Sequence, residues 1–250
     1  RPYIRTHLPP PDLSIVADRD AWAMAVEGVR NPRPLTVGEL KRMGIDTVAT
    51  VLQCSGNGRG YFADKPSGTK WTVGAAGCVI WSGVPVRKVV AGRGGVPEGA
   101  RFMTGPGGGT RPSGIDPRTA IVERSMPLKA FEDALLAWEM NGEPLPHAHG
   151  GPLRLVAPGY SGVNNIKYVK RLAFTPIETD AAIQRTGYRI SPAGGKGDPS
   201  HPSVWEMEAK SWINGPDPEQ GPVRAGRGQV HGVAMGGRRA LGRGGVPRCG

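Results

Sequence analysis

The chain has 250 residues, of which 39 are Gly and 25 are Pro, and 38% of its residues are hydrophobic. These values predict one large or two modest folded domains rich in loops, and they exclude a wholly disordered chain. The net charge of +11 indicates an anionic partner. Because the positive residues are spread along the whole chain, we expect small anions in a pocket and no nucleic acid.

The first quarter of the chain predicts two strands around a short helix. A strand is expected over residues 21–28. Thr36 and Glu39 form a Thr-x-x-Glu capping box, which predicts a short helix that stops at Gly44. The β-branched run that follows predicts a buried strand over 46–53.

The middle of the chain continues as a mixture of helices, loops and strands without an internal repeat. A short helix is expected over 84–91, and the Gly- and Pro-rich residues 92–118 are expected to form a long loop. Pro127 predicts a helix start that continues to about Asp133. Asn141-Gly142 then predicts a hairpin turn between two strands. Further strands are expected over 153–157 and 165–174, and loops over 191–203 and 214–228.

Cysteine usage and hydropathy exclude several classes of protein. Cys54, Cys78 and Cys249 form no CxxC pair, no zinc spacing and no haem-attachment CxxCH motif, so no haem is expected in this chain. No apolar run reaches the length of a membrane span, and no signal peptide is visible. The chain begins at Arg1, which indicates a processed or partial sequence.

Cys54 is the most informative cysteine. It follows the strand at 46–53 in a turn rich in Gly and Asn, and Arg59 comes five residues later. A thiolate is a soft metal ligand, and a nearby guanidinium stabilises it and attracts anions. From the residues alone, a buried thiol that merely ends a strand is the competing interpretation. Cys78 lies in an apolar stretch and is expected to be packed and inert, whereas Cys249 lies in a Gly/Arg tail and is expected to be incidental.

Five segments in order resemble blocks of the sulfite oxidase family of molybdopterin enzymes. They are 5–11 (RTHLPPP), the cysteine segment 50–60, 71–75 with 81–85, 136–146 and 149–155. The resemblance covers roughly residues 1–235 and implies an α+β, sulfite-oxidase-type molybdopterin-binding fold over 1–225, with mixed sheets, short helices and many loops.

The end of the chain departs from the family. Residues 230–237 resemble the first strand of an immunoglobulin-like second domain, but 241–250 match nothing in it. We therefore expect 226–250 to be the remnant of that domain in a truncated chain. In full-length members this domain makes the dimer and supplies a third pocket arginine, so its loss puts dimerisation of this chain in question.

The resemblance implies a role for each motif residue of the reaction centre. Cys54 would be the protein thiolate on molybdenum. Arg5 and Arg59 would line the sulfite pocket, and Trp71 would form its aromatic wall. The hydroxyl of Tyr188 would point at the anion and help to couple proton and electron transfer. Taken singly, the arginines would be surface residues and Trp71 part of the core.

A second group is implied to hold the molybdopterin and its phosphate. These residues are Ile4, Arg5, His7, Cys54, Asp116, His149, Arg154, Asn165, Ile166 and Lys167. Asp116 would bind the NH groups of the pterin ring, although its spacing departs from the family pattern. His147 and His149 could place two imidazoles on one strand face, but the sequence supplies no further ligands for zinc.

The implied function is oxidation of sulfite to sulfate at a molybdenum–molybdopterin centre. A separate c-type cytochrome would accept the electrons, and the resemblance is to periplasmic sulfite dehydrogenases of bacteria. Sulfane-sulfur dehydrogenases and methionine-sulfoxide reductases share the fold and are alternatives. A non-catalytic domain that binds the cofactor or polyanions is an alternative of another class.

Overall fold

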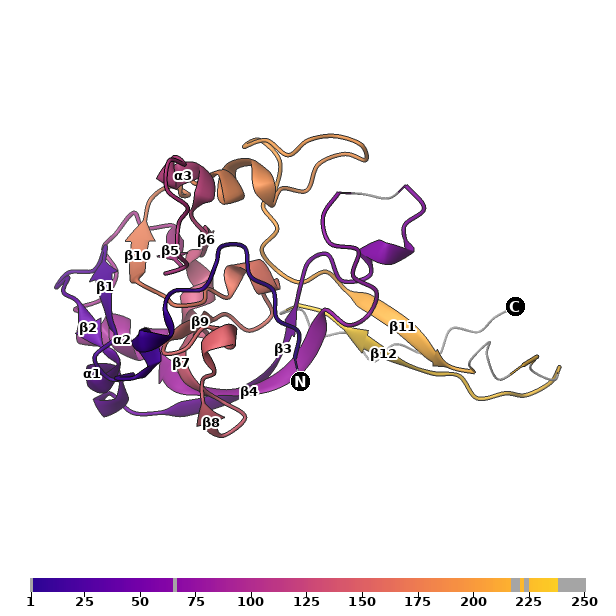
Figure 1. The fold of residues 1–250 in the computed structure, drawn as a ribbon, viewed down its shortest axis with the longest axis horizontal. Helices are drawn as coiled ribbons and strands as arrows, with labels where there is room; N and C mark the ends of the chain where they lie inside the picture. Colours follow the sequence, from indigo (N-terminus) through magenta and orange to yellow (C-terminus); the bar gives the residue numbers. More distant parts are fainter. Residues whose placement is uncertain (1, 65–66, 217–220, 223–224, 238–250) are drawn as a thin grey trace.

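The computed structural model describes residues 2–64, 67–216, 221–222 and 225–237. In these residues two five-stranded sheets and a two-stranded ribbon are joined by short helices and long loops. Figure 1 shows the two sheets gathered in one body, with the ribbon projecting from it. This is the mixed α+β organisation that the sequence predicts.

The first sheet has the strand order β2-β1-β10-β5-β6. Its strands are β1 (Ala23–Glu27), β2 (Leu35–Thr36), β5 (Phe102–Pro106), β6 (Glu123–Pro127) and β10 (Arg171–Thr175). Strands β1 and β10 pair in parallel, whereas the other neighbours are antiparallel. This parallel pair joins β1, near the N-terminus, to β10, which lies almost 150 residues later in the chain.

The second sheet is antiparallel throughout and carries the predicted cysteine strand at its edge. Its order is β3-β4-β7-β8, and β9 pairs with the part of β7 that β8 leaves open. The strands are β3 (Asp46–Gln53), β4 (Ala76–Pro85), β7 (Leu135–Met140), β8 (Glu143–Pro144) and β9 (Arg154–Val156). The ribbon consists of β11 (Lys210–Gly215) and β12 (His231–Met235).

The helices are short and have clear local causes. In α1 (Val37–Arg42), the hydroxyl of Thr36 accepts from the Glu39 amide at 3.1 Å, and the Glu39 carboxylate accepts from the Thr36 amide at 2.8 Å. This confirms the capping box. The remaining helical elements are α2 (Val86–Gly92), α3 (Pro117–Ala120), the 3₁₀ turns η1 (Leu13–Val16), η2 (Arg59–Tyr61), η3 (Leu128–Glu132), η4 (His147–His149) and η5 (Gly162–Asn164), and the π-helix η6 (Ile183–Gly187).

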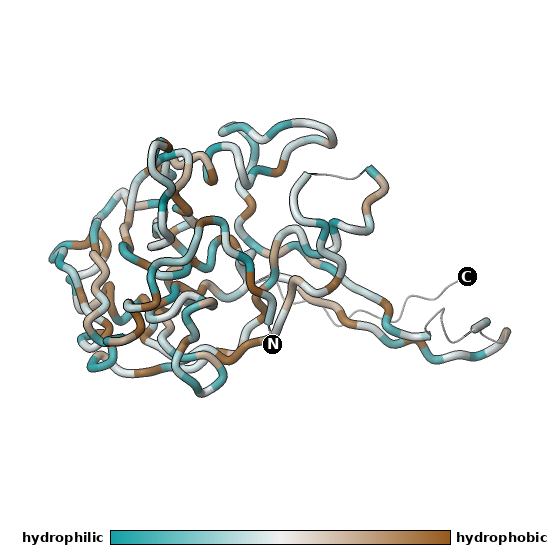
Figure 2. Tube along the Cα trace, viewed as in Figure 1, coloured by the Kyte–Doolittle hydropathy of each residue, from teal (hydrophilic) through white to brown (hydrophobic). Residues whose placement is uncertain are grey.

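Strand β7 explains how the second sheet buries both of its faces. Leu136 and Trp138 belong to the larger apolar cluster, which also contains residues of the first sheet, whereas Leu135 and Ala137 belong to a smaller cluster. Successive side chains of a strand point to opposite faces, so these four neighbours contribute to two cores. Tyr3 packs against the smaller cluster, so the N-terminal segment lies on that side. In Figure 2, hydrophobic segments run through the body.

Several sequence predictions of local structure are confirmed. The expected strands at 21–28, 46–53 and 153–157 are β1, β3 and β9. The hairpin turn lies between β7 and β8, and Asn141 adopts the left-handed conformation, with a φ of 55°. The helix expected over 84–91 is α2, whose first two expected residues belong to β4 instead.

Other predictions are wrong because tertiary pairing overrides local composition. The expected loop 92–118 contains β5, which is held between β10 and β6 despite its Gly and Pro residues. Pro127 ends β6, and only a 3₁₀ turn follows it. Of the strand expected over 165–174, only the second half is strand β10. The edge strand β3 alternates between half-buried and exposed residues from Asp46 to Thr50, and only its last two residues are buried, so the prediction of a strand buried throughout is wrong.

Candidate active site

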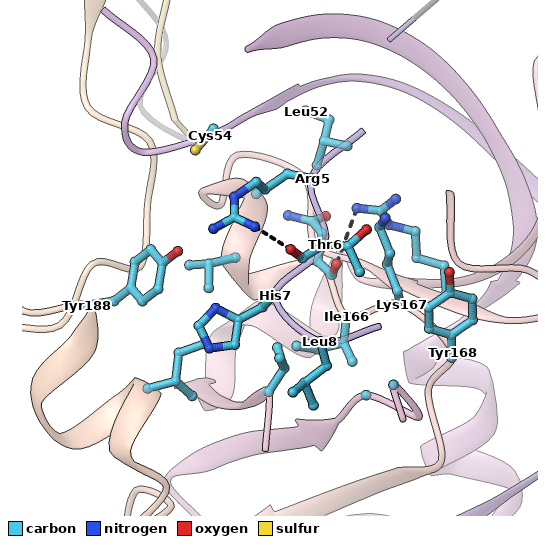
Figure 3. A pocket seen from close by; sticks show the side chains of 18 of the residues that line it. Arg5, Thr6, His7, Leu8, Leu52, Cys54, Ile166, Lys167, Tyr168 and Tyr188 are labelled. Atoms are coloured by element: carbon cyan, nitrogen blue, oxygen red, sulfur yellow. Dashed lines mark hydrogen bonds between the residues drawn. The ribbon is translucent and has the colours of Figure 1, made fainter. Parts of the chain in front are cut away.

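One pocket collects residues from segments that are far apart in the sequence. The N-terminal segment, the turn after β3, the loop before β10 and the region around η6 all line it (Figure 3). Eight of the predicted site residues are among its lining: Arg5, His7, Cys54, Arg154, Asn165, Ile166, Lys167 and Tyr188.

The turn that carries Cys54 is fixed by backbone and buried amide groups. The Cys54 amide donates to Ala75 O at 2.9 Å, and Cys54 O accepts from the Asn57 amide at 2.9 Å. The buried Asn57 side chain accepts from the Ala75 amide at 3.0 Å and donates to the Gln53 side chain at 3.2 Å. Asn57 therefore ties the turn both to its own strand and to the next segment. Cys54 is a free, half-buried thiol.

Arg5 and Tyr188 lie at the same end of the pocket as Cys54. Figure 3 shows the Arg5 guanidinium and the Tyr188 hydroxyl turned toward the space beside the Cys54 sulfur. Burial raises the pKa of Tyr188, the charge of Cys54 raises it further, and Arg5 opposes the shift. Tyr188 follows η6, and the guanidinium of buried Arg124 lies 5.5 Å from its ring centroid. This end therefore combines a thiol, a guanidinium and a protonated phenol.

The other end of the pocket is built around a buried arginine. Arg154, on β9, is only 4% exposed and donates to His149 O at 2.7 Å and to Asn165 O at 3.3 Å. Its guanidinium lies 5.2 Å from the centroid of the Trp81 ring. Burial lowers the pKa of Arg154 to about 10. The Asn165 side chain accepts from the Ala157 amide at 2.9 Å, and its backbone amide donates to Gly162 O at 3.1 Å, so Asn165 is held on all sides by the protein.

Lys167 adds a second cation at this end. Its ammonium group donates to Ala148 O at 2.6 Å. Burial, followed by repulsion from Arg154 and Arg5, lowers the pKa of Lys167 to about 8. Burial and the same kind of repulsion lower the pKa of His149 to about 4. Within the described part of the chain, no Asp or Glu lines the pocket, so carboxylates from the protein do not compensate these cations.

Unpaired donors and a glycine wall indicate that the pocket accommodates a ligand. The Arg154 Nε atom and the Tyr168 hydroxyl are buried without a hydrogen-bond partner among the described residues. Such groups are costly unless a ligand or water completes them. A Cβ atom at Gly107 would lie 2.9 Å from Lys167 O, so a side chain there would crowd this wall. The cationic end thus fits an anionic group such as a phosphate.

Two further predicted residues border the pocket without lining it. Arg59 is half-buried and donates to Thr69 O at 3.2 Å. Its charge nevertheless acts on Tyr188 and Lys210, so the guanidinium lies within electrostatic reach of the Cys54 end. Trp71 packs edge-on against Tyr3 with ring centroids 5.7 Å apart.

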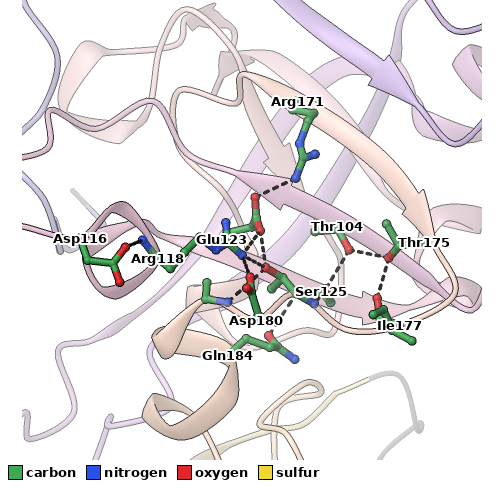
Figure 4. Close-up of polar contacts among 12 residues, drawn as sticks. Thr104, Asp116, Arg118, Glu123, Ser125, Arg171, Thr175, Ile177, Asp180 and Gln184 are labelled. Carbon is green, nitrogen blue, oxygen red and sulfur yellow. Dashed lines mark hydrogen bonds and ion pairs between the residues drawn. The ribbon is translucent and has the colours of Figure 1, made fainter.

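Three predicted residues lie elsewhere. Ile4 is 54% exposed, and His149 is buried outside the pocket lining, with its carbonyl accepting from Arg154. Asp116 is the N-cap of α3 and accepts from the Arg118 amide at 2.9 Å, outside the pocket lining. Asp116 begins a helix in the network of Figure 4, so its geometry gives no support to the predicted contact with a pterin ring.

The remaining histidines and cysteines behave differently from the sequence prediction. His147 and His149 lie in the 3₁₀ turn η4 rather than on a strand, and His147 Nε2 lies 2.9 Å from Pro11 O. Among the described residues, no group of three His, Cys, Asp or Glu side chains could hold a metal ion. Cys78 is exposed on β4, so the prediction of a packed thiol is wrong. Cys249 lies outside the described residues.

Sequence reasoning missed pocket residues that lie next to predicted ones. Tyr3 precedes the 5–11 motif, and Tyr168 follows Lys167 directly, but neither stood out in the sequence. Gly107 and Gly109 belong to a triple glycine that the sequence suggested was only a loop. The run of three glycines was the available signal, because glycine allows a neighbouring segment to approach the backbone closely.

Comparison with known proteins defines first the class and then the family. Residues 7–183 match the family of oxidoreductase molybdopterin-binding domains. Mitochondrial sulfite oxidase of Homo sapiens is 31% identical over 251 aligned positions, which cover 96% of this chain and 45% of that protein. Mitochondrial sulfite oxidase of Drosophila melanogaster is 30% identical over 193, covering 75% of this chain and 32% of that protein. The chain therefore belongs to the sulfite oxidase family of molybdopterin oxidoreductases, as its sequence segments predicted.

Other relatives show the breadth of this family. Nitrate reductase [NADH] 2 of Phaseolus vulgaris is 29% identical over 226 positions, which cover 85% of this chain and 24% of that protein. The sulfane dehydrogenase SoxCD from Paracoccus pantotrophus has a similar structure, with a TM-score of 0.67 and 27% identity over 88% of this chain and 54% of that one. The chain spans less than half of the length of each of these curated relatives.

In the part of the chain that the structure describes, no helix has the length and apolar character needed to cross a membrane.

Proposed function

We propose that this chain oxidises sulfite to sulfate, with Cys54 as the protein ligand of a molybdenum–molybdopterin centre. The observation that carries the proposal is that the two ends of the pocket differ in their chemistry. One end holds a thiol, a guanidinium and a phenol, and the other end holds cations that no carboxylate among the described lining residues neutralises. A metal at the first end and the phosphate of its organic ligand at the second would satisfy both.

The same difference between the two ends of the pocket suggests which residues would hold the cofactor. Arg154 and Lys167 would hold the phosphate, supported by the Tyr168 hydroxyl and the backbone at Ile166. His7 would contact the cofactor from the N-terminal segment. When bound, the group supplies the two-electron redox chemistry that converts sulfite and water to sulfate and two protons.

The substrate residues act by charge and proton supply. Arg5 offers the fixed positive charge and planar donors that suit a small oxyanion, and Arg59 adds charge from behind the turn. Trp71 and Tyr3 would close the apolar side. Because its pKa is raised, Tyr188 keeps its proton at neutral pH and can donate a hydrogen bond to the bound anion.

We also infer the surroundings of the reaction. The electrons would pass one at a time to a separate c-type cytochrome, in the periplasm. Residues 1–225 would form the catalytic domain, and 226–250 would be the remnant of the start of an immunoglobulin-like dimerisation domain. Strand β12 (His231–Met235) lies where the first strand of that domain was expected, and it pairs with β11 (Lys210–Gly215) on the other side of this division. The lack of a lysine-rich tail speaks against a nucleic-acid partner.

A second candidate is oxidation of sulfane sulfur. The observation that favours it is the structural similarity to the sulfane dehydrogenase SoxCD over 88% of this chain. Sulfite and a sulfane-sulfur substrate are both sulfur compounds that a thiolate-bound metal could oxidise, so the pocket does not choose between them. Parallel assays with each substrate on the same preparation decide between the two.

The decisive experiment measures molybdenum content and sulfite-dependent reduction of ferricyanide or cytochrome c on one purified sample. We expect near-stoichiometric molybdenum and turnover in the wild type. Cys54→Ser should abolish turnover, because replacing the thiolate changes the electronics of the metal. Cys78→Ser is the matched control, since this thiol is exposed on β4, away from the pocket, and its loss should leave the rate unchanged.

The outcomes separate the three classes of function. Wild-type rates in Cys54→Ser would refute the assignment of the metal ligand. Turnover with sulfane sulfur but not with sulfite would establish the second candidate. A protein that binds polyanions and contains no molybdenum would be the non-catalytic binding domain.

A further inference from the structure

The ribbon strand β11 presents one face to the turn that carries Cys54. Its burial alternates, with Lys210 and Trp212 half-buried and Ser211 and Ile213 exposed. Alternate residues of a strand point to the same side, so Lys210 and Trp212 share the covered face. In Figure 1, β11 leaves the body beside the loop that follows β3.

Lys210 makes the specific contact. Its ammonium group donates to Asn57 O at 2.6 Å and to Ser55 O at 3.3 Å. These two carbonyls belong to the three residues that directly follow Cys54. One charged donor thus bridges both sides of a tight turn, and hydrogen bonds from a charged group are stronger than those between neutral groups.

Trp212 adds an apolar contact at the far side of the same turn. Its ring lies 3.9 Å from the position that a Cβ atom at Gly58 would occupy. Gly58 has a φ of 89°, a left-handed conformation that favours glycine. The aromatic ring therefore covers the point at which the turn reverses direction.

The opposite side of the turn is held by a different segment. The Gly58 amide donates to Thr72 O at 2.6 Å, and the Gly60 amide donates to Trp71 O at 2.8 Å. The turn is thus clamped between residues 71–75 on one side and β11 on the other. Only the first of these segments belongs to the family motifs noted in the sequence.

We propose that Lys210 is a positioning residue that holds the turn of Cys54 in the geometry for binding the metal, with Trp212 as its apolar support. The significance of this geometry rests on the proposed function, in which Cys54 is the metal ligand. The clamp itself does not depend on the reaction. The ribbon β11–β12, which projects from the body, is thereby linked to the reaction centre.

Amide hydrogen exchange on the full chain tests the clamp, with molybdenum measured on the same sample. The reporters are the amides of Asn57 and Arg59, which donate to Cys54 O at 2.9 Å and to Gly56 O at 3.0 Å within the turn. Lys210→Met keeps the length of the side chain and removes the donor. We expect exchange at the two reporters to accelerate by roughly tenfold.

Two further variants make the result specific. Lys210→Arg retains a charged double donor and should keep the wild-type protection. Lys196→Met removes an exposed lysine and should change nothing. In molybdenum-loaded samples, Lys210→Met should lower kcat for sulfite more than it changes KM, because Lys210 contacts the turn rather than the anion.

Each outcome decides the proposal. Wild-type exchange at Asn57 and Arg59 in Lys210→Met would overturn it. If Lys210→Met also accelerates exchange in β4 and β7, general unfolding explains the loss, and Lys210→Arg then decides, since its failure to restore protection would overturn the clamp. Lack of molybdenum in all samples would refute the proposed function and leave the exchange result interpretable.

Discussion

Two polar regions of this molecule differ in whether their buried charges are paired with opposite charges of the protein. In the cluster of Figure 4, the carboxylate of Glu123, only 3% exposed, accepts from Arg118 at 3.0 Å and from Arg171 at 2.9 Å. Thr179 also donates to it. In the pocket of Figure 3, the cations Arg154 and Lys167 donate to backbone carbonyls, and no Asp or Glu in the described part of the chain lines the pocket.

The difference distinguishes a structural cluster from a binding site. The arginines and hydroxyl around Glu123 lower the pKa of its carboxyl group, although its burial opposes this, so the charges stabilise one another. In the pocket, burial and mutual repulsion lower the pKa of Lys167 to about 8. A site that keeps like charges together at a cost to stability is suited to an anionic ligand that relieves the repulsion.

The largest effect on stability is expected in the structural cluster. Glu123→Gln removes the negative charge that two arginines share, and leaves them with only a neutral partner. Because Arg118 and Arg171 are about a third exposed, we expect a loss of about 2–3 kcal/mol in the free energy of unfolding, less than for a fully buried pair. Urea denaturation measures this loss, with exposed Glu98→Gln as the control. A change equal to that of the control would mean that this cluster is not structural.

The same removal of charge in the pocket should instead weaken ligand binding. Lys167→Met deletes a charge-assisted donor worth about 1.5–3 kcal/mol, so molybdopterin should dissociate roughly 10- to 100-fold faster. The stability of the cofactor-free chain should be unchanged or higher, because repulsion with Arg154 and Arg5 is relieved. Dissociation is followed by molybdenum release, with Lys196→Met as the control. If Lys167→Met releases molybdenum as slowly as the wild type but is less stable, Lys167 has a structural role and does not hold the ligand.

The pH dependence of anion binding sharpens this contrast. Because the pKa of Lys167 is lowered to about 8, its positive charge is present below that pH and is lost above it. In the cofactor-free chain, sulfate stands in for the phosphate at the end of the pocket with Arg154 and Lys167, and its own charge is constant in this range. Its affinity for this end should therefore fall as the pH rises through about 8. Isothermal titration from pH 6 to pH 10 measures the fall. The step should be absent in Lys167→Met, and a step that persists in this variant would assign the titration to another group.

The smallest effect is expected at Tyr168. Its hydroxyl is buried and unpartnered among the described residues, so Tyr168→Phe removes a donor that the protein itself does not use. Stability should stay the same or rise slightly, whereas cofactor affinity should fall about fivefold, the value of one neutral hydrogen bond. Thermal unfolding and molybdenum release on matched samples test both. An unchanged affinity would leave the hydroxyl without a role in binding.

Local chemistry allowed much of the chain to be predicted from its residues. The capping box of Thr36 and Glu39 and the turn at Asn141 depend on neighbours in the sequence, so their signals are complete within a few residues. The ordered motifs identified the family, and the structure brings three of the predicted site residues, Cys54, Arg154 and Lys167, to one pocket. The predictions of the cap and the turn succeeded because the residues that decide each of them lie within a few positions of one another.

Contacts between distant segments were decided only by the tertiary structure. Strand β5 forms in a Gly- and Pro-rich stretch because β10 and β6 complete its hydrogen bonds, which no local propensity encodes. Asp116 caps a helix away from the pocket, and Lys210 reaches back to the carbonyl of Asn57. The sequence by itself determined which residue types are available. Whether a charge meets a partner, as at Glu123, or is left for a ligand, as at Lys167, depends on which segments the folded chain brings together.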